Sequence, residues 1–160
     1  MPGPLDGIRI LDLSAVISGP YGTMILADQG ADVIKVEPPG RGDFTRSAGN
    51  KSGGMSASFL NNNRNKRSIT LDLKSPAGLN IVKRLAAISD VVVQNFRPGV
   101  VERLGVGEED LRKIKPDLIY VSISGFGEEG PFCDRPVYDP IVQALSGLAS
   151  VQGGSDQARP

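Results

Sequence analysis

The stretch QNFRPGVVERLG at residues 94–105 places an amide, an aromatic ring and two guanidinium groups close together, at Asn95, Phe96, Arg97 and Arg103. These groups suit a nucleotide, because an aromatic ring stacks on a base and a guanidinium group binds phosphate through paired hydrogen bonds. A structural interpretation is also open, with Phe96 in the core and the two arginines as solvated charges on a helix. The residue types alone favour that structural interpretation.

A second basic group lies in NNNRNKRSITLDLKSP at residues 61–76, where Arg64, Lys66 and Arg67 follow three asparagines. The pattern predicts a basic, amide-rich loop that leads into a short apolar strand. Basic clusters are most often solvated surface, so this cluster does not indicate a site by itself.

Histidine is absent from the sequence, and cysteine occurs once, at Cys133. Catalysis would therefore use carboxylates, hydroxyls, amides or basic side chains, and no metal site is predicted. Asp139 follows a glycine-rich loop and is a candidate catalytic residue, but Pro140 after it equally predicts that Asp139 is a helix N-cap. A single cysteine excludes a disulfide framework and fits a reducing, cytoplasmic compartment.

The composition is that of an ordinary globular domain, with 39% apolar and 22% charged residues and a net charge of zero over 160 residues. A chain of this length suits one domain. The charge balance gives no reason to expect a nucleic-acid partner. No apolar run approaches the ~18 residues of a membrane span, and the start MPGPLDG lacks a secretory apolar core. We therefore expect neither nucleic acid nor membrane as a partner.

Short apolar runs alternate with helical patterns along the chain. We expect a long glycine-rich loop over residues 38–58, strands over 8–14, 31–37, 68–73, 90–96 and 117–125, and helices over 20–30, 76–86, 98–104, 108–115 and 139–148. This alternation indicates an α/β fold with a parallel sheet that helices cover on both faces. Ligands of such sheets bind beyond the carboxyl ends of the strands, so we expect the site among residues 14–20, 37–43, 94–99 and 124–139.

A dinucleotide site is one alternative, because Glu37 ends the second strand 18 residues after Gly19, near the position of a ribose-binding acid. The turn SAVISGPYG, however, contains only Gly19 and Gly22. The third glycine of the fingerprint that lets a backbone contact a pyrophosphate is missing, so the NAD interpretation is not favoured.

Four long stretches together resemble the amino-terminal half of the family III CoA-transferases. These are GIRILDLSAVISGPYGTMILADQGADVIKVEPPGRGD, NKRSITLDLKSPAG, DVVVQNFRPGVVERLG and SISGFGEEGPFCDRPVYDPIVQALSGLASVQG, in that order and over nearly the whole chain. The family includes the formyl-CoA and carnitine CoA-transferases and the related alpha-methylacyl-CoA racemases. The resemblance implies a Rossmann-like CoA-binding domain, an interlocked homodimer and transfer of CoA between carboxylic acids. It implies CoA or acyl-CoA as substrate and no covalently bound cofactor.

The resemblance also implies which residues contact CoA. Lys74 would lie near the nucleotide phosphates, with Lys66 and Arg67 more loosely in the same cleft. Many relatives carry a basic residue where this sequence has Pro38, and Arg41 is the replacement nearest to it. The implied contacts are Ile17, Ser18, Leu71, Asp72, Leu73, Lys74, Asn95, Phe96, Arg97 and Arg103.

In the family, an aspartate attacks the acyl-CoA and forms an anhydride and then an aspartyl-CoA thioester. That aspartate follows a Gly-Gly-x-x-x-x-x-Pro region, which matches residues 153–160 here, so the resemblance places it just beyond Pro160. Tyr138 and Asp139 would then have auxiliary roles. We accordingly expect residues 1–160 to form the amino-terminal part of the CoA-binding large domain, with the small domain and the carboxyl-terminal return segment absent from this sequence.

Two other functions stay open. The racemases have a His-Asp pair where this sequence has Tyr138 and Asp139, and tyrosine, with an ordinary pKa of about 10, is a poor base near neutral pH. The pair therefore favours a transferase over a racemase. A non-catalytic CoA-binding or dimerisation module is the other alternative.

Overall fold

The computed structural model describes residues 3–152 of the chain. The chain divides into two compact units, Met1–Ile123 and Ser124–Pro160, and each unit is described by itself. The sequence region from residue 153 onward, where the glycine pair lies, falls outside the described residues.

The first unit contains a sheet of five parallel strands. In spatial order the strands are β5 (Lys66–Thr70), β2 (Asp32–Glu37), β1 (Arg9–Asp12), β6 (Val91–Gln94) and β7 (Ile119–Ser122). Renumbered along the chain within this sheet, the order is third, second, first, fourth and fifth, which is the order of the dinucleotide-binding fold. The prediction of an α/β fold with a Rossmann-like parallel sheet is confirmed.

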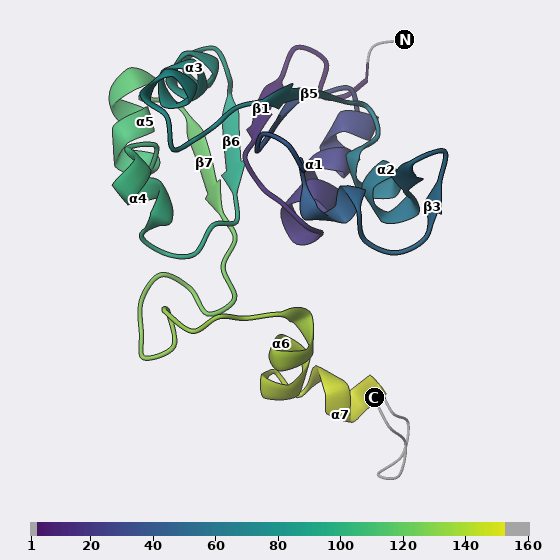
Figure 1. Ribbon diagram of the computed structural model, residues 1–160. Helices are drawn as coiled ribbons and strands as arrows, with labels where there is room; N and C mark the ends of the chain where they lie inside the picture. Colours follow the sequence, from purple (N-terminus) through teal and green to yellow (C-terminus); the bar gives the residue numbers. More distant parts are fainter. Residues whose placement is uncertain (1–2, 153–160) are drawn as a thin grey trace. The chain divides into compact units, whose positions relative to one another are not determined.

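Helices cover one face of the sheet with a continuous apolar core. Leu11, Ile34 and Val92 point from the strands into it, and α3 (Pro76–Ala87), α4 (Val100–Leu104) and α5 (Glu108–Ile114) close it. Figure 1 shows these three helices together on one side of the strands. Each helix contributes buried side chains to this core, namely Val82, Ala86, Val101 and Leu111.

The other face is covered by α1 (Ser18–Asp28), against which α2 (Ala57–Asn63) packs (Figure 1). Its core is smaller and includes Ile10, Val33 and Val93 from the strands and Ala27 from α1. Ile10 and Leu11 thus serve opposite faces, as successive residues of a strand must. Strands that are buried on both faces explain the near-continuous apolar runs in the sequence.

The prediction of one long loop over residues 38–58 holds only in part, because short helical and strand elements interrupt this segment. It contains a turn of 3-10 helix at Phe44–Arg46, the short hairpin of β3 (Lys51–Ser52) and β4 (Met55–Ser56), and the start of α2. Ser56 caps α2 by accepting a hydrogen bond from the Phe59 amide. The glycines favoured a loop over residues 38–58, and the three asparagines at 61–63, which are weak helix formers, favoured a loop after it. Burial of Phe59, Asn62 and Asn63 instead stabilises the helix α2.

Two elements begin earlier in the chain than predicted. The helix expected to begin at Pro20 begins at Ser18. The strand expected from Ser68 begins at Lys66, whose side chain is buried and therefore belongs to the packed part of the sheet. By contrast, Ser75 caps α3 and Pro76 occupies its first turn, as predicted.

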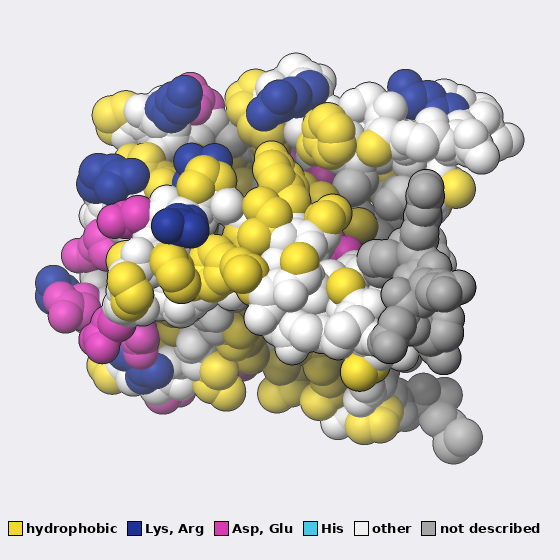
Figure 2. Space-filling model, turned by 90° about the horizontal axis from the view of Figure 1, so that it is seen from below, with side chains coloured by type: hydrophobic (Ala, Val, Ile, Leu, Met, Phe, Trp, Pro, Cys, Tyr) yellow, Lys and Arg dark blue, Asp and Glu magenta, His cyan; other side chains and the backbone are white. Residues whose placement is uncertain are grey.

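The second unit contains two short helices, α6 (Asp139–Leu145) and α7 (Leu148–Gln152). The single helix expected there is interrupted at Gly147, whose φ of 79° ends the first helix in a left-handed conformation. Neither helix buries any residue. Figure 2 shows hydrophobic side chains exposed on one face of the molecule. The exposed large hydrophobic residues of the second unit include Phe132, Tyr138 and Leu145. None of the helices within residues 3–152 has the length and apolar character needed to cross a membrane.

Candidate functional site

The strand order reverses between β1 and β6, and the crevice at such a reversal is where ligands of this fold bind. At the carboxyl ends of these two strands, the Asn95 side chain is bonded to the backbone of Ala15. Its Oδ1 accepts from the Ala15 amide at 2.9 Å, and its Nδ2 donates to the Ala15 carbonyl at 2.8 Å. Asn95 therefore ties the connection after β6 to the connection after β1.

Residues 14–16, in the loop between β1 and α1, also form hydrogen bonds with side chains of β1 and β2. The Ser14 amide donates to Asp12 Oδ1 at 3.0 Å, and the buried Lys35 Nζ donates to the Ser14 carbonyl at 2.9 Å. Gly19 in the first turn of α1 fits against Ser14 so closely that a Cβ there would come within 2.3 Å of the Ser14 side chain. The start of α1 is thus packed directly on this loop.

Asp43 completes the support of the loop. Its carboxylate forms a fully buried ion pair with Lys35 at 2.9 Å, and accepts from the Thr45 amide and hydroxyl and, at 3.3 Å, from the Val16 amide. Burial by itself would raise the pKa of Asp43, but the hydrogen bonds from Lys35 and Thr45 outweigh burial and the pKa is lowered. Asp43 is therefore an ionised anchor near neutral pH.

A second buried ion pair lies beneath the loop. Lys66 Nζ is 2.9 Å from Asp12 Oδ2 and also donates to the Pro20 carbonyl and to Asn63. Burial lowers the pKa of Lys66, and the Asp12 carboxylate opposes part of that shift. The expectation that Lys66 is a solvated surface charge is wrong, because its side chain is only 2% exposed. It is an internal link between β5 and the end of β1.

The carboxylate of Glu37 is fully occupied within the protein. It receives two hydrogen bonds from Arg46, one from the Ser68 hydroxyl and one from the Asp43 amide. Burial opposes ionisation, but these bonds outweigh it and lower the pKa of Glu37 to about 2. Arg46 in turn lies 3.8 Å from the centre of the Phe59 ring. Glu37 is thus not free to bind ribose hydroxyls, which counts further against the dinucleotide interpretation.

The predicted CoA contacts of the first unit all follow the carboxyl ends of β1, β5 and β6, so the fold brings them to one edge of the sheet. They differ in what their side chains do. Leu71 is buried in the main core, and Leu73 and Phe96 are partly buried and pack against it, which supports the structural interpretation of Phe96. The side chains left exposed at this edge are Ile17, Ser18, Asp72, Lys74, Arg97 and Arg103.

Residues 71–74 form a tight connection between β5 and α3. The Lys74 amide donates to Asp72 Oδ1, and the Asp72 carbonyl accepts from the Ser75 hydroxyl. Gly78 in the first turn of α3 lies so close that a Cβ there would be 2.1 Å from the Asp72 carbonyl oxygen. The backbone of this segment is therefore fixed, while the Lys74 side chain extends into solvent.

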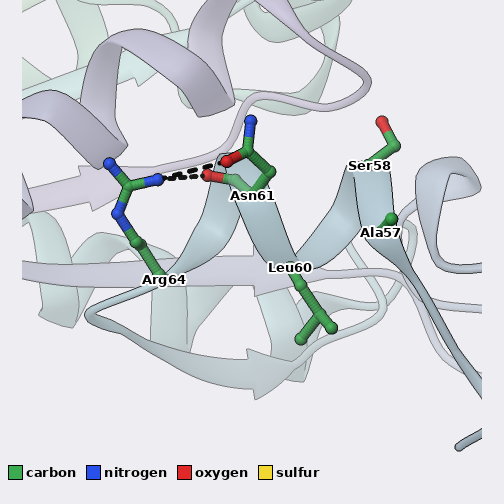
Figure 3. Close-up of a pocket in the computed structure, with 5 residues that line it drawn as sticks. All are labelled: Ala57, Ser58, Leu60, Asn61 and Arg64. Carbon is green, nitrogen blue, oxygen red and sulfur yellow. Dashed lines mark hydrogen bonds between the residues drawn. The ribbon is translucent and has the colours of Figure 1, made fainter. Parts of the chain in front are cut away.

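The surface has two further pockets, one at this edge of the sheet and one on α2. A polar pocket at the ends of β2 and β5 is lined by Arg41 together with Glu37, Arg46 and Ser68, so Arg41 does lie at the carboxyl edge. The other pocket, on α2, is lined by Ala57, Ser58, Leu60, Asn61 and Arg64 (Figure 3). Arg64 is already bound there, to the Asn61 carbonyl at 2.9 Å and to Asp28 at the end of α1.

Arg67 does not lie at the expected cleft. Its guanidinium group binds Asp32 at the beginning of β2, where Arg9 binds the same carboxylate. Because Asp32 starts its strand, this cluster lies at the amino ends of the strands and not at the edge that carries the CoA candidates. The prediction that Arg67 adds charge to that cleft is therefore not supported by its position.

Tyr138 and Asp139 belong to the second unit. Tyr138 is 74% exposed and its carbonyl accepts the Ile141 amide at the start of α6. The N-cap of this helix is Tyr138 and no side chain caps it, so the interpretation of Asp139 as the N-cap is wrong. Asp139 instead lies in the first turn and accepts a hydrogen bond from Gln143. No group of three potential metal ligands occurs among the described residues.

Sequence analysis missed the residues that support the loop, namely Asp12, Lys35 and Asp43. The available signal was a charged residue inside each of two apolar strands, in ILDLS and VIKVE. A charge in a strand that is buried on both faces needs a partner of opposite charge, because an unpaired buried charge is very costly.

Comparison with known proteins shows which family the sequence matches. The model of CoA-transferase family III matches residues 5–160. The succinyl-CoA:glutarate CoA-transferase of Mus musculus is 51% identical over 154 residues, which cover 96% of this chain and 35% of that protein. The acetyl-CoA:oxalate CoA-transferase of Acetobacter aceti is 49% identical over 154 residues, which cover 96% of this chain and 40% of that protein.

A solved structure has the same fold. The crystal structure of a CAIB/BAIF family protein from Brucella suis matches with a TM-score of 0.93 and 41% sequence identity, over 100% of this chain and 43% of that one. The chain thus spans less than half the length of these relatives.

Proposed function

This chain belongs to CoA-transferase family III, and on that premise we propose that the complete protein transfers coenzyme A from an acyl-CoA to a second carboxylic acid. The observation that carries the proposal is the match of the family over residues 5–160. Relatives that are 44–51% identical to the chain and named as CoA-transferases support it. Residues 1–160 would be the amino-terminal part of the large, CoA-binding domain of a homodimeric, cytoplasmic enzyme.

We assign the CoA site to the carboxyl edge of the sheet in the first unit. Three exposed cations, Lys74, Arg97 and Arg103, follow strands that end at this edge, and Arg41 lines a pocket at the ends of β2 and β5. CoA carries several phosphate groups, and cations at the mouth of such a sheet would bind them. Arg41 would replace the basic residue that many relatives carry at the position of Pro38.

The proposed chemistry is nucleophilic. An aspartate carboxylate, which we place beyond residue 160, attacks the thioester carbonyl. The CoA thiolate is expelled, and the aspartate and the acyl group form an anhydride on the enzyme. The thiolate then attacks the aspartyl carbonyl, which releases the donor acid and leaves an aspartyl-CoA thioester. The acceptor carboxylate reverses these steps and departs as the new acyl-CoA. Tyr138 and Asp139 would assist without forming the covalent bond.

The test uses the complete protein with succinyl-CoA and a panel of dicarboxylates that includes glutarate and oxalate. We expect a new acyl-CoA to form with an equal amount of free succinate. Hydroxylamine should inactivate the enzyme only after the enzyme has been incubated with an acyl-CoA, because hydroxylamine cleaves the aspartyl thioester that then forms. Hydrolysis to free CoA without a new thioester, or no turnover with any acid of the panel, would contradict the proposal.

A further inference from the structure

Val16, in the loop between β1 and α1, has a left-handed backbone conformation with a φ of 70°. This conformation is rare for any residue other than glycine, and for a β-branched residue it is an outlier. Asn65 is the only other non-glycine residue with positive φ in the described part of the chain, and asparagine tolerates this conformation far better. Val16 is therefore the clearest strained position of residues 3–152.

The strain is held by side chains from outside the loop. The Ala15 amide and carbonyl are bonded to Asn95, the Ser14 carbonyl to Lys35, and the Val16 amide to Asp43. These side chains come from β2, from the segment after β2 and from the residue that directly follows β6. Strained backbone persists only where its surroundings fix it in this way, and it is concentrated at functional sites.

A role in stability alone does not explain the arrangement. A buried ion pair such as Lys35–Asp43 often stabilises a fold no more than a well-packed apolar pair would, because both charges lose their hydration. A valine in the left-handed region lowers stability further. What the arrangement does achieve is to fix the direction in which the chain leaves the loop, toward the exposed residues Ile17 and Ser18.

We propose that Asp43 and Asn95 are positioning residues that hold Val16 in its left-handed conformation and so prearrange the CoA-binding connection between β1 and α1. The inference rests on the proposed function for its ligand. It gives Asn95 a different role from the direct CoA contact that the family resemblance implies. Both functional groups of its amide already bind Ala15.

The test is a rescue at Val16. Asp43→Asn removes the ion pair with Lys35 and weakens the hydrogen bond to the Val16 amide. We expect the Kd for CoA to rise about tenfold, the equivalent of ~1.4 kcal/mol, when it is measured by calorimetry on the complete protein. Adding Val16→Gly should recover most of that affinity, because glycine adopts positive φ without help. The melting temperature lost in Asp43→Asn should not return, since the ion pair is still broken.

The matched control is Val16→Ala in the same background. Alanine removes the same two methyl groups but still disfavours positive φ, so it should not restore binding. Asn95→Ala gives a second case, because a residue that contacts CoA directly cannot be rescued from position 16, whereas a positioning residue can. Equal recovery with alanine and glycine, or no recovery with glycine, would overturn the inference.

A further measurement separates this inference from the proposed function. If the wild-type protein does not bind CoA, the proposed function is wrong, and amide hydrogen exchange then decides the positioning role. Asp43→Asn should accelerate exchange of the Ala15 and Val16 amides by about tenfold or more while the amides of β2 keep their protection. Unchanged exchange at Ala15 and Val16 would overturn the positioning role whatever the ligand.

Discussion

At the carboxyl end of β2, Glu37 is a buried carboxylate whose four hydrogen bonds keep it ionised. Its pKa of about 2 in the folded protein lies below its ordinary value of 4.5. A group with a depressed folded pKa stabilises the fold above its unfolded pKa and loses that contribution as the pH falls toward the folded pKa. The relevant window is therefore between about pH 4.5 and pH 2.

We predict that Glu37→Gln lowers the free energy of unfolding at pH 7 by on the order of 2 kcal/mol, because it breaks the charged pair with Arg46. The difference between wild type and variant should shrink as the pH falls to 3, since the unfolded wild-type glutamate then becomes protonated. Urea unfolding followed by circular dichroism at both pH values measures this. Glu108→Gln, which alters an exposed pair with Arg112, is the control and should change little at either pH. A difference that is the same at pH 7 and pH 3 would count against the role given to Glu37.

The exposed arginines near β6 allow a second prediction at the scale of residues. Arg97→Ala and Arg103→Ala should each weaken CoA binding by roughly 1.5–3 kcal/mol, the value of a charged hydrogen bond to phosphate. Arg112→Ala, on α5 and also exposed, is the control for a general loss of positive charge and should leave the affinity nearly unchanged. Calorimetric titration with CoA measures all three. Unchanged affinity in both Arg97→Ala and Arg103→Ala would remove the CoA site from this edge.

Residue patterns predicted where Asn95 and Arg97 lie in the sheet better than they predicted what each side chain contacts. Asn95 and Arg97 were predicted from their place after an apolar run, and they do follow the carboxyl end of β6. The partners of Lys35 and Lys66 lie 8 and 54 residues away in the sequence, at Asp43 and Asp12, so no local pattern reveals them. Both pairs form only when the sheet and the segment after β2 have folded, so the tertiary structure decides them and not the local sequence.

Among the elements, α1 and α3 each contain a glycine in or near the first turn, Gly22 and Gly78, and the space around these two glycines differs. Gly78 of α3 lies against the Asp72 carbonyl, with room for no side chain, whereas nothing lies within 4 Å of a Cβ at Gly22 of α1. Both have ordinary helical backbones, so alanine is compatible with the conformation of each.

We therefore predict opposite effects of the same substitution. Gly22→Ala should raise the free energy of unfolding by roughly 0.5–1 kcal/mol, because glycine is the weaker helix former. Gly78→Ala should lower it by roughly 1–3 kcal/mol through overpacking, and should also weaken CoA binding because it displaces residues 71–74. Urea unfolding and calorimetry on the two variants measure these effects. A stabilising Gly78→Ala would show that the connection after β5 is not fixed as described.

Elements were predictable where local signals agreed with packing, and not otherwise. Ser75 followed by Pro76 predicted the start of α3 because the cap and the proline are both local. The helix α2 was not predicted, because its asparagines disfavour a helix and its packing against α1, β4 and the 3-10 helix at Phe44–Arg46 stabilises it. The break between α6 and α7 at Gly147 was not predicted, because the apolar residues on both sides of Gly147 keep the spacing of one continuous helix.

At the scale of the whole molecule, the question is which reaction of the family the complete protein performs. Racemisation moves the proton beside the thioester carbonyl off one face and back onto the other, so it needs an acid–base group on each face. The second unit presents Tyr138 and Asp139 at the start of α6, and the sequence contains no histidine. A phenol is a poor base at neutral pH, whereas CoA transfer needs only one nucleophilic carboxylate.

We predict that the complete protein does not exchange the alpha proton of a 2-methylacyl-CoA. The experiment incubates the protein with that thioester in deuterated water without an acceptor acid, and follows deuterium by mass spectrometry. Tyr138→Phe, which removes only the hydroxyl of a 74% exposed side chain, is the matched variant. In a transferase, neither protein incorporates deuterium at the alpha carbon, because no step breaks that bond. Steady incorporation by the wild type that disappears in Tyr138→Phe would assign the proton transfer to this hydroxyl and would replace the transferase by a racemase.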